Sequence, residues 1–303
     1  MQPRKLTIVF NPKGGSAKVN TVTEVAQLFR DQGVQTDVVH TTAEAGSATR
    51  LATRAALFGA DVVIPFGGDG TVRQVAQGLI GSAATLAVFP GGTGNLFARS
   101  FYANPTAKQF VAMVMAGNSQ PIDMVRLDYT GEDGVEHCEY QLVALGLGKV
   151  SDAISDSSPF YKRIFGKLVY AVNISIASLK PEALTFRLKT RDAVLEDDAA
   201  AVFVLNVTPP LMSALSRGVN ASDGLLDVVV LKGTNTWHLI RFGFSMAFGQ
   251  PEHSSHYHRF RTEEVLIESS GLVKPNIDGD PGQPTKSLRV TNVKGALKVI
   301  LSH

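Results

Sequence analysis

The stretch Val62–Leu79, VVIPFGGDGTVRQVAQGL, decides how the first part of the chain folds. Its apolar start ends abruptly in glycines that surround one aspartate, and apolar residues then recur at helical spacing. The pattern predicts a strand over Asp61–Phe66, a tight glycine-rich turn, and a helix over Val72–Leu79. Ligands of α/β proteins bind at such turns, beyond the carboxyl ends of the strands.

The flanking sequence repeats this alternation of strand and helix up to about residue 122. Such a rhythm predicts a parallel sheet covered by helices on both faces. The further elements expected are strands at Lys5–Phe10, Thr36–His40 and Thr85–Phe89, and helices at Val19–Asp31, Ser47–Phe58 and Pro105–Met115.

From about Ile122 the sequence becomes rich in short β segments separated by polar turns, which predicts a second, mainly antiparallel domain. Helical stretches near Tyr161–Leu179 and Thr236–Phe248 interrupt it. The expected strands are Met124–Tyr129, Tyr140–Leu145, Leu184–Thr190, Val202–Val207, Leu226–Leu231, Glu264–Glu268 and Leu288–Val293.

Composition is that of a globular protein of about two domains: 303 residues, 44% hydrophobic and 18% charged. A net charge of +2 argues against a nucleic-acid binder. One cysteine, Cys138, excludes an internal disulfide and a zinc site of several thiolates, and favours a reducing compartment. No apolar window approaches the ~18 residues of a membrane span. We therefore expect a cytoplasmic protein, with peripheral contact to a membrane left open.

Three glycine-rich turns follow expected strands, after Phe10, Phe66 and Phe89. Glycine lets an anion approach the backbone closely, and a helix N-terminus adds N–H donors and a positive dipole end. We expect these turns, which lie at one edge of a parallel sheet, to hold phosphate groups together. For any single turn, an ordinary tight strand–helix connection remains an alternative.

Asp69 is the unusual member of the second turn, because a carboxylate repels phosphate. It would fit if a magnesium ion lay between the two, or if it oriented a hydroxyl or a water. The alternative is a helix N-cap. Neither a G-x-x-x-x-G-K-[ST] loop nor a G-x-G-x-x-G fingerprint is present, which lowers support for dinucleotide redox chemistry.

Taken together, the motifs resemble the catalytic domain of the diacylglycerol kinase family, which includes sphingosine and ceramide kinases and bacterial soluble lipid kinases. The resemblance extends over essentially the whole chain. Its motifs are Asn11-Pro12-x-x-Gly15, Gly67–Thr71, Pro90–Arg99, Asn220–Asp227 and Asn276–Asp280.

The resemblance implies a Rossmann-like α/β domain of the NAD kinase/diacylglycerol kinase type over residues 1–122 and a C-terminal β-sandwich domain for the lipid substrate over residues 123–303. We leave open that the C-terminal strand returns to the first domain. The implied activity is phosphorylation of a lipid hydroxyl with ATP and Mg²⁺ as cofactors, so the implied partner is a lipid.

The resemblance also assigns roles to residues. Asp278 falls at the general base, with Asp69 as a second catalytic carboxylate, and magnesium would be held by Asn220, Asp223 and Leu225. The residues implied in ATP binding are Asn11, Thr42, Gly67, Gly68, Asp69, Gly70, Thr71, Val72, Arg73, Gly92 and Thr93.

Two positions depart from the family pattern: Leu96 stands where bacterial members carry an aspartate, and Asp280 where glutamate is frequent. They motivate one alternative, a nucleotide- or lipid-binding regulator without turnover. The other alternative is a soluble-substrate kinase such as an NAD kinase. The sequence leaves open the lipid, the oligomeric state, a homodimer included, and any role of His253, His256 and His258.

Overall fold

The structure is a computed structural model, and it divides the chain into two compact units: Met1–Asp123 with Lys294–His303, and Met124–Val293. The long strands β5 (Ser119–Thr130) and β15 (Thr285–Ile300) each begin in one unit and end in the other. The helices expected near residues 161–179 and 236–248 lie outside the described residues. The structure describes residues 2–13, 19–91, 95–102, 104–148, 184–207, 218–232 and 257–301.

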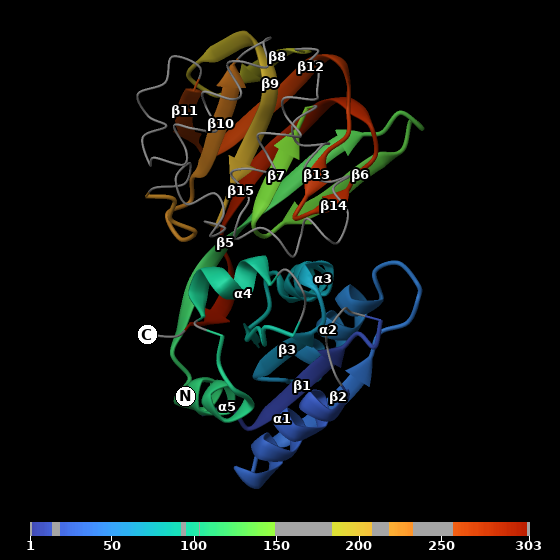
Figure 1. The fold of residues 1–303 in the computed structure, drawn as a ribbon, viewed down its shortest axis with the longest axis vertical. Coiled ribbons are helices and arrows are strands. Elements are labelled where there is room, and N and C mark those ends of the chain that lie inside the picture. Colours follow the sequence, from blue (N-terminus) through green and yellow to red (C-terminus); the bar gives the residue numbers. More distant parts are fainter. Residues whose placement is uncertain are drawn as a thin grey trace, which may run out of the picture. The chain divides into compact units, whose positions relative to one another are not determined.

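The first unit is a parallel sheet with helices on both faces (Figure 1). Its strand order is β15-β4-β3-β1-β2, because the end of β15 pairs in parallel with β4. The strands are β1 (Lys5–Phe10), β2 (Gln35–His40), β3 (Val62–Phe66) and β4 (Thr85–Leu86). The helices are α1 (Val19–Asp31), α2 (Ser47–Leu57), α3 (Asp69–Leu79), α4 (Leu96–Phe101) and α5 (Ala107–Ala116).

The core of this unit follows from the apolar periodicity of its elements. Alternate residues of β1 and β3 pack with α1 and α5, while α2 and α3 contact each other. Phe66 stacks on Phe89 at 4.7 Å between ring centroids, and Phe89 meets Phe110 edge to face at 5.1 Å. These rings bury the carboxyl ends of the strands, so the turns that follow start from a rigid base.

Two boundaries differ from the expectation in a way that matters for the turns. Helix α3 begins at Asp69 rather than at Val72, because extended Gly68 serves as its N-cap and the aspartate enters the first turn. Strand β4 ends at Leu86 rather than at Phe89. Helix α4 was not expected; it directly follows the third glycine-rich turn.

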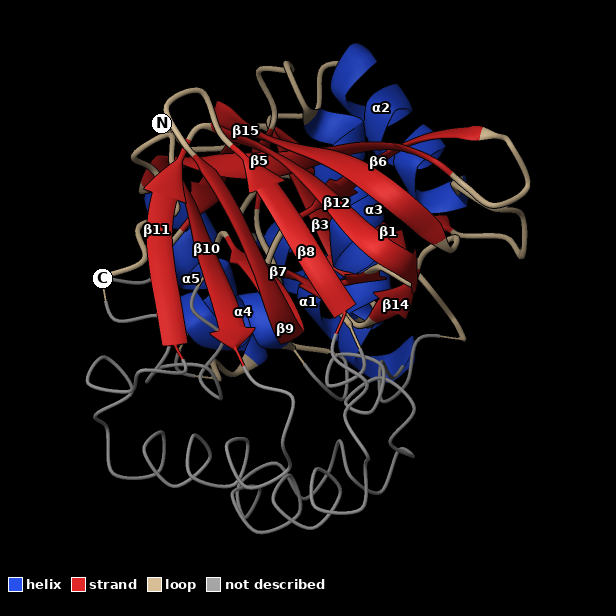
Figure 2. Cartoon of the chain, turned by 90° about the horizontal axis from the view of Figure 1, so that it is seen from above, coloured by secondary structure: helices blue, strands red, loops and turns tan. Residues whose placement is uncertain are grey.

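The second unit is an antiparallel, strand-rich unit (Figures 1 and 2). Its main strand order is β14-β13-β7-β9-β8-β12-β15; β10 pairs with β9 and β11, and β5 with β15 and β6. Besides β5 and β15, its strands are β6 (Glu136–Gln141), β7 (Ala144–Leu147), β8 (Leu184–Lys189), β9 (Val194–Leu205), β10 (Leu226–Lys232), β11 (Tyr257–Thr262), β12 (Glu264–Val273), β13 (Asn276–Ile277) and β14 (Asp280–Pro281).

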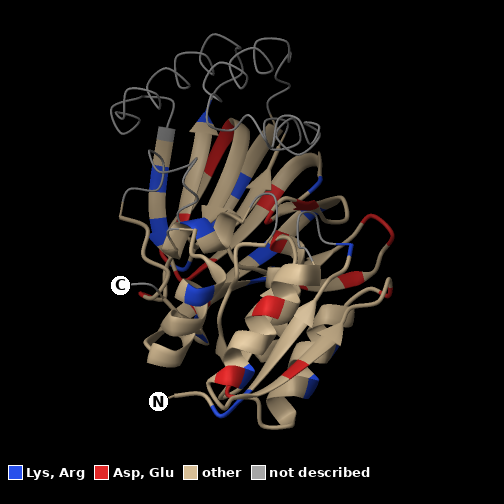
Figure 3. Ribbon diagram, turned by 60° about the horizontal axis from the view of Figure 1, so that its bottom comes forward, with Lys and Arg blue, Asp and Glu red and all other residues tan. Residues whose placement is uncertain are grey.

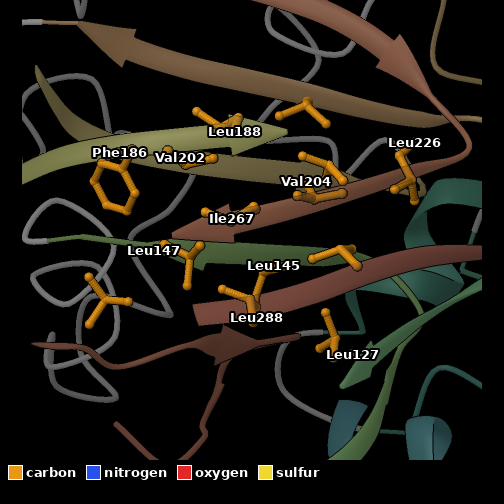
Figure 4. Close-up of a cluster of buried hydrophobic side chains, with 14 of the residues drawn as sticks. Leu127, Leu145, Leu147, Phe186, Leu188, Val202, Val204, Leu226, Ile267 and Leu288 are labelled. Carbon is orange, nitrogen blue, oxygen red and sulfur yellow. The ribbon is translucent and has the colours of Figure 1, made fainter. Parts of the chain in front are cut away.

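One apolar cluster forms the core of this unit, and it draws side chains from most of the strands. Figure 4 shows Leu145, Val204 and Ile267 within it. Ion pairs between strands, such as Lys189–Glu268 at 2.8 Å, lie at partly exposed positions among charges of both signs (Figure 3). Such pairs are worth about 0–1 kcal/mol, so the apolar cluster rather than the charges holds the sheet together.

The single strand expected at Tyr140–Leu145 is wrong in one respect: the structure splits it into β6, which ends at Gln141, and β7, which begins at Ala144. The break falls at Leu142 and Val143. Their N–H groups leave the ladder and donate to a side chain instead, as described below.

The segment with His253, His256 and His258 is only partly covered, since residues 253 and 256 lie outside the described residues. His258 belongs to β11, where it pairs with Val230 of β10. Of the helices in the described ranges, none is long and apolar enough to cross a membrane.

Candidate functional site

The second glycine-rich turn, Gly67–Thr71, joins β3 to the N-terminus of α3 (Figure 1). Thr71 is buried, and its N–H donates to the Gly68 carbonyl at 2.9 Å, which closes the first turn of the helix. The first N–H groups of a helix have no partner within the helix and carry its positive dipole end. The turn can therefore offer N–H donors to an anion.

The glycines at 67 and 68 serve different purposes. A Cβ at Gly67 would lie 2.6 Å from the Thr71 Oγ1 and 3.1 Å from the Asn11 Cβ, so packing requires glycine there. Among the described residues, a Cβ at Gly68 would meet nothing within 4 Å, and its φ of −80° suits any residue. Within the described part of the chain, neither packing nor backbone conformation requires glycine at residue 68, so the turn is open at this position.

Asp69 links the second turn to the third. Its Oδ1 accepts a hydrogen bond from the Leu96 N–H at 2.7 Å. The alternative interpretation of Asp69 as an N-cap is wrong, because Gly68 occupies that position and no side chain caps the helix. The carboxylate thus holds the start of α4, where Asn95 has a left-handed φ of 50°.

Asn11 links the first turn to the second. Its backbone N–H donates to the Phe66 carbonyl at 2.9 Å, and its Nδ2 donates to the Thr71 Oγ1 at 3.1 Å. Its own Oδ1 accepts from the Lys13 N–H at 3.0 Å, which shapes the start of the first turn. These hydrogen bonds bring Asn11, Gly67–Thr71 and Leu96 together, as the shared edge of a parallel sheet requires.

The remaining residues expected to bind ATP are less tightly defined. Thr42 is exposed just after β2; its N–H donates to the Ser47 Oγ at 2.9 Å, and its Oγ1 accepts from the Glu44 N–H. Gly70, Val72 and Arg73 lie in the first turns of α3. Gly92 and Thr93 lie outside the described residues.

Asp278 occupies a two-residue hairpin turn between β13 and β14. Asp278 and Gly279 both have positive φ, 54° and 95°, which is the signature of a type I′ turn and explains the Asp-Gly pair. The Asp-Gly pair in the sequence is typical of such a turn. The sequence did not predict burial: only 7% of Asp278 is exposed.

The Asp278 carboxylate accepts hydrogen bonds from three successive backbone N–H groups. Leu142 donates to Oδ2 at 2.7 Å, while Val143 and Ala144 donate to Oδ1 at 2.8 and 2.9 Å. The Asp278 N–H donates back to the Ala144 carbonyl at 2.9 Å. A carboxylate has about four lone-pair sites, so these bonds fix its orientation and stabilise its charge.

The segment implied to hold magnesium, Asn220–Asp227, is already paired with a cationic side chain, Arg261 of β11. Asp223 Oδ1 accepts from the Leu225 N–H at 3.0 Å, and its Oδ2 pairs with the Arg261 guanidinium. Asn220 Oδ1 accepts from the Ser222 N–H at 3.1 Å. In this arrangement the Asp223 carboxylate does not fit a magnesium ion, because the ion would have to displace the Arg261 guanidinium. Within the described ranges, no group of three His, Cys, Asp or Glu residues could hold a metal.

The buried neighbour of this pair is Asp227, which is 1% exposed and bonds to Arg259. Arg261 lies 3.6 Å from the same Asp227 oxygen, so two guanidinium groups serve two carboxylates. The alternation Arg-x-Arg on β11 opposite the acidic segment was visible in the sequence, but only strand register places them together.

Sequence reasoning missed the residues that hold Asp278. Leu142, Val143 and Ala144 act through backbone N–H groups, which carry no signal in side-chain chemistry. Asn206, which contacts the Leu142 carbonyl, and Gln141, which precedes Leu142 and contacts the Val204 carbonyl, are polar residues next to apolar runs, and that irregularity was the available signal.

The comparisons with known proteins agree with this geometry. Residues 5–127 match the family model of the diacylglycerol kinase catalytic domain. The diacylglycerol kinase of Bacillus subtilis (strain 168) is 27% identical over 287 residues, which cover 92% of this chain and 90% of that protein.

Two solved structures show the fold. A crystal structure of a Bacillus anthracis (str. Sterne) protein, proposed to be a diacylglycerol kinase, has a TM-score of 0.80 at 24% identity and covers 100% of this chain and 96% of that chain. Yeast NADH kinase complexed with NADH has a TM-score of 0.58 at 11% identity and covers 100% of this chain and 85% of that chain. The expected fold class, an α/β domain of this type followed by a strand-rich domain, is confirmed.

Proposed function

Because residues 5–127 belong to the diacylglycerol kinase catalytic-domain family, we propose that this chain is a lipid kinase that transfers the γ-phosphate of ATP to a lipid hydroxyl. The observation that carries the proposal is the turn Gly67–Thr71, with its open position at Gly68, within the matched domain. The relative from Bacillus subtilis, named a diacylglycerol kinase over most of this chain, supports the same activity.

The ATP phosphates would be held by the second turn, with N–H groups at the start of α3 as donors. Asn11 and Thr71 keep the first two turns in register, and Asp69 does the same for the third. The further residues proposed to contact nucleotide are Thr42, Gly67, Gly68, Gly70, Val72, Arg73, Gly92 and Thr93. When bound with ATP, magnesium neutralises charge on the phosphates.

Asp278 would take the proton of the acceptor hydroxyl as the new bond to phosphorus forms. The three N–H donors support this role because they hold the carboxylate in one orientation. Phosphoryl transfer depends mainly on alignment and charge stabilisation, so a fixed acceptor of the proton is what the reaction needs from this residue.

The acceptor is proposed at the level of a lipid hydroxyl: diacylglycerol, a sphingoid base or a related lipid. Peripheral contact with a membrane surface follows from a substrate of that kind. Magnesium at Asn220, Asp223 and Leu225 remains a separate hypothesis that the Arg261–Asp223 pair weighs against.

Two rival functions are separated from this proposal by experiment. A soluble-substrate kinase such as an NAD kinase has a distant likeness in fold, at 11% identity. A regulator that binds nucleotide without turnover is motivated by Leu96 and Asp280. The late Asp-Gly-Asp segment and the run Gly92–Arg99 favour the lipid kinase.

The deciding experiment is transfer from γ-labelled ATP into a total lipid extract in mixed micelles, with the labelled product identified by mass. We expect one labelled phospholipid class, absent with Gly68→Val. Label in NADP⁺ instead of lipid would establish the soluble-substrate kinase. Saturable ATP binding without any labelled product, from lipid or from NAD⁺, would establish the regulator.

A further inference from the structure

Two buried amide side chains lie behind the segment that holds Asp278. Asn206 is 1% exposed and follows the end of β9. Gln141 is fully buried and is the last residue of β6. Asn206 contacts the Leu142 carbonyl, where the strand expected from the sequence is broken, and Gln141 directly precedes Leu142 and contacts the Val204 carbonyl.

Asn206 donates hydrogen bonds to the carbonyl oxygens of two successive peptide groups. Its Nδ2 donates to the Leu142 carbonyl at 2.9 Å, and its backbone N–H donates to the Val143 carbonyl at 3.0 Å. The Leu142 carbonyl shares a planar peptide group with the Val143 N–H, and the Val143 carbonyl shares one with the Ala144 N–H. These are the two N–H groups that donate to Asp278 Oδ1.

Each of the two peptide groups is therefore held at both ends, by Asn206 at the carbonyl and by Asp278 at the N–H. Because the peptide group is planar, fixing the carbonyl fixes the direction in which the N–H points. Hydrogen bonds at the two ends of one peptide group also polarise each other and strengthen together. The orientation of the carboxylate thus depends in part on the Asn206 side chain, through the peptide group that Leu142 and Val143 share.

Gln141 fixes the third donor. Its side-chain Nε2 donates to the Val204 carbonyl at 3.0 Å, and its own carbonyl shares a peptide group with the Leu142 N–H, which donates to Asp278 Oδ2. Its Oε1 is buried without a hydrogen-bond partner among the described residues. An unpaired buried acceptor costs stability that an apolar residue of the same size would not cost. Stability alone therefore does not explain glutamine here.

We infer that Asn206 and Gln141 are positioning residues, which set the direction of the Asp278 carboxylate through the peptide groups of Leu142–Ala144. The inference rests on the proposed role of Asp278 as the base. It adds two residues to the transfer step that act without meeting ATP or the lipid. Their loss should lower kcat and leave the binding of ATP unchanged.

The test compares Asn206→Ala and Gln141→Leu with a matched control, Leu188→Ala, which removes a buried side chain from β8 in the same unit. We expect kcat for lipid phosphorylation to fall at least about tenfold in the two amide variants, with KM for ATP within about twofold. The control should lower Tm comparably and keep kcat. An equal loss of kcat in Leu188→Ala would mean that the amide variants lose activity because the whole unit is destabilised, and not because Asp278 is misplaced.

A second readout needs no catalysis. Amide hydrogen exchange at Val143, whose peptide group loses the Asn206 side-chain bond, should be at least about tenfold faster in Asn206→Ala, while the amides of Val265 and Ile267 in β12 keep their rates. Wild-type kcat and exchange in Asn206→Ala, alongside an inactive Asp278→Gly, would overturn the inference and leave the proposed function standing. An Asp278→Gly variant with wild-type turnover would refute the base itself, whatever the exchange rates.

Discussion

The carboxylate of Asp69 accepts a hydrogen bond from the backbone N–H of Leu96 at 2.7 Å, so the second glycine-rich turn holds the third. Leu96 stands where the family pattern has a further aspartate. The backbone N–H of residue 96 is present whatever its side chain, so this link survives the departure. What the departure removes is a second negative charge near the turns, which makes the charge of Asp69 more important.

Two substitutions of Asp69 separate its charge from its hydrogen bond. Asn at 69 keeps an oxygen that can accept from the Leu96 N–H, whereas Ala removes it. If the negative charge of Asp69 attracts a magnesium ion that lies between it and the phosphates, both variants should lose at least about a hundredfold in kcat. Only Asp69→Ala should speed amide exchange at Leu96, because only this variant loses the hydrogen bond. Full activity in Asp69→Asn would confine Asp69 to holding the turns together.

The neighbouring glycines provide a matched pair for the phosphate cradle. Gly67→Ala places a Cβ 2.6 Å from the Thr71 Oγ1, and relieving such overpacking costs about 1–3 kcal/mol, so Tm should drop by several degrees. The Cβ of Gly68→Ala meets no atom of the described residues within 4 Å, so this variant should keep its Tm. Its methyl group enters the space assigned to phosphate, so the Kd for ATP should rise at least about tenfold.

Calorimetric titration with ATP and thermal unfolding of both variants test the pair. Unchanged ATP affinity in Gly68→Ala would show that this turn does not hold the ATP phosphates. A low Tm in the same variant would mean that the space at residue 68 is needed by the protein itself.

Much of the fold was accessible from the sequence because its first unit obeys local rules. Lys5–Phe10 and Val19–Asp31 were predicted to the residue, since buried parallel strands read as apolar runs and amphipathic helices as apolar stripes. The errors fell where backbone geometry overrides periodicity. Helix α3 gained a turn because Gly68 could cap it, and β4 ended early.

The candidate site divides in the same way. The glycine-rich turns were recognisable because glycine and a lone carboxylate are unusual after an apolar strand. The surroundings of Asp278 were not, because its partners are N–H groups of Leu142–Ala144, more than 130 residues earlier in the chain. A backbone donor has no side chain to identify it, and only the antiparallel register of β13 with β7 brings the two together.

In a variant that lacks the Asp278 carboxylate, the N–H groups of Leu142–Ala144 lose their acceptor and should bind a small carboxylate from solution. Gly is the better replacement than Ala, because the φ of 54° is left-handed, and Asn would turn its amide hydrogens toward an N–H donor. We expect Asp278→Gly to lose at least about a hundredfold in kcat, with the Kd for ATP within a few-fold.

Formate should then restore part of the activity of Asp278→Gly in a saturable manner, because successive backbone N–H groups form an anion site. Chloride at the same ionic strength is the control. A variant that loses ATP binding along with turnover would instead place Asp278 in the nucleotide site.

Cys138 should react slowly with iodoacetamide although it is exposed. Partial burial raises the pKa of its thiol, and nearby Asp128 adds to the shift against the lowering effect of Arg126. The thiolate is the reactive form, so a raised pKa leaves less of it at pH 8. Alkylation followed by mass spectrometry should be several-fold slower than for the same chain in guanidinium, where the pKa returns to its usual range of about 8.5. Equal rates would mean that the β5–β6 pairing does not shield the thiol.

Arg261 and magnesium compete for Asp223, and thermal unfolding can show which one the protein uses. The guanidinium pairs with Asp223 Oδ2 and lies 3.6 Å from an Asp227 oxygen, so the acidic segment is already neutralised. We therefore expect the wild-type Tm without nucleotide to be insensitive to Mg²⁺ and to EDTA.

Arg261→Met removes the internal cation and keeps the length of the side chain. Its Tm should be lower and should rise with Mg²⁺, since a ligand that binds only the folded state stabilises it in proportion to ln(1 + [L]/Kd). A wild-type Tm that falls in EDTA and recovers with Mg²⁺ would instead show that the ion displaces Arg261 and occupies the site formed by Asn220, Asp223 and Leu225.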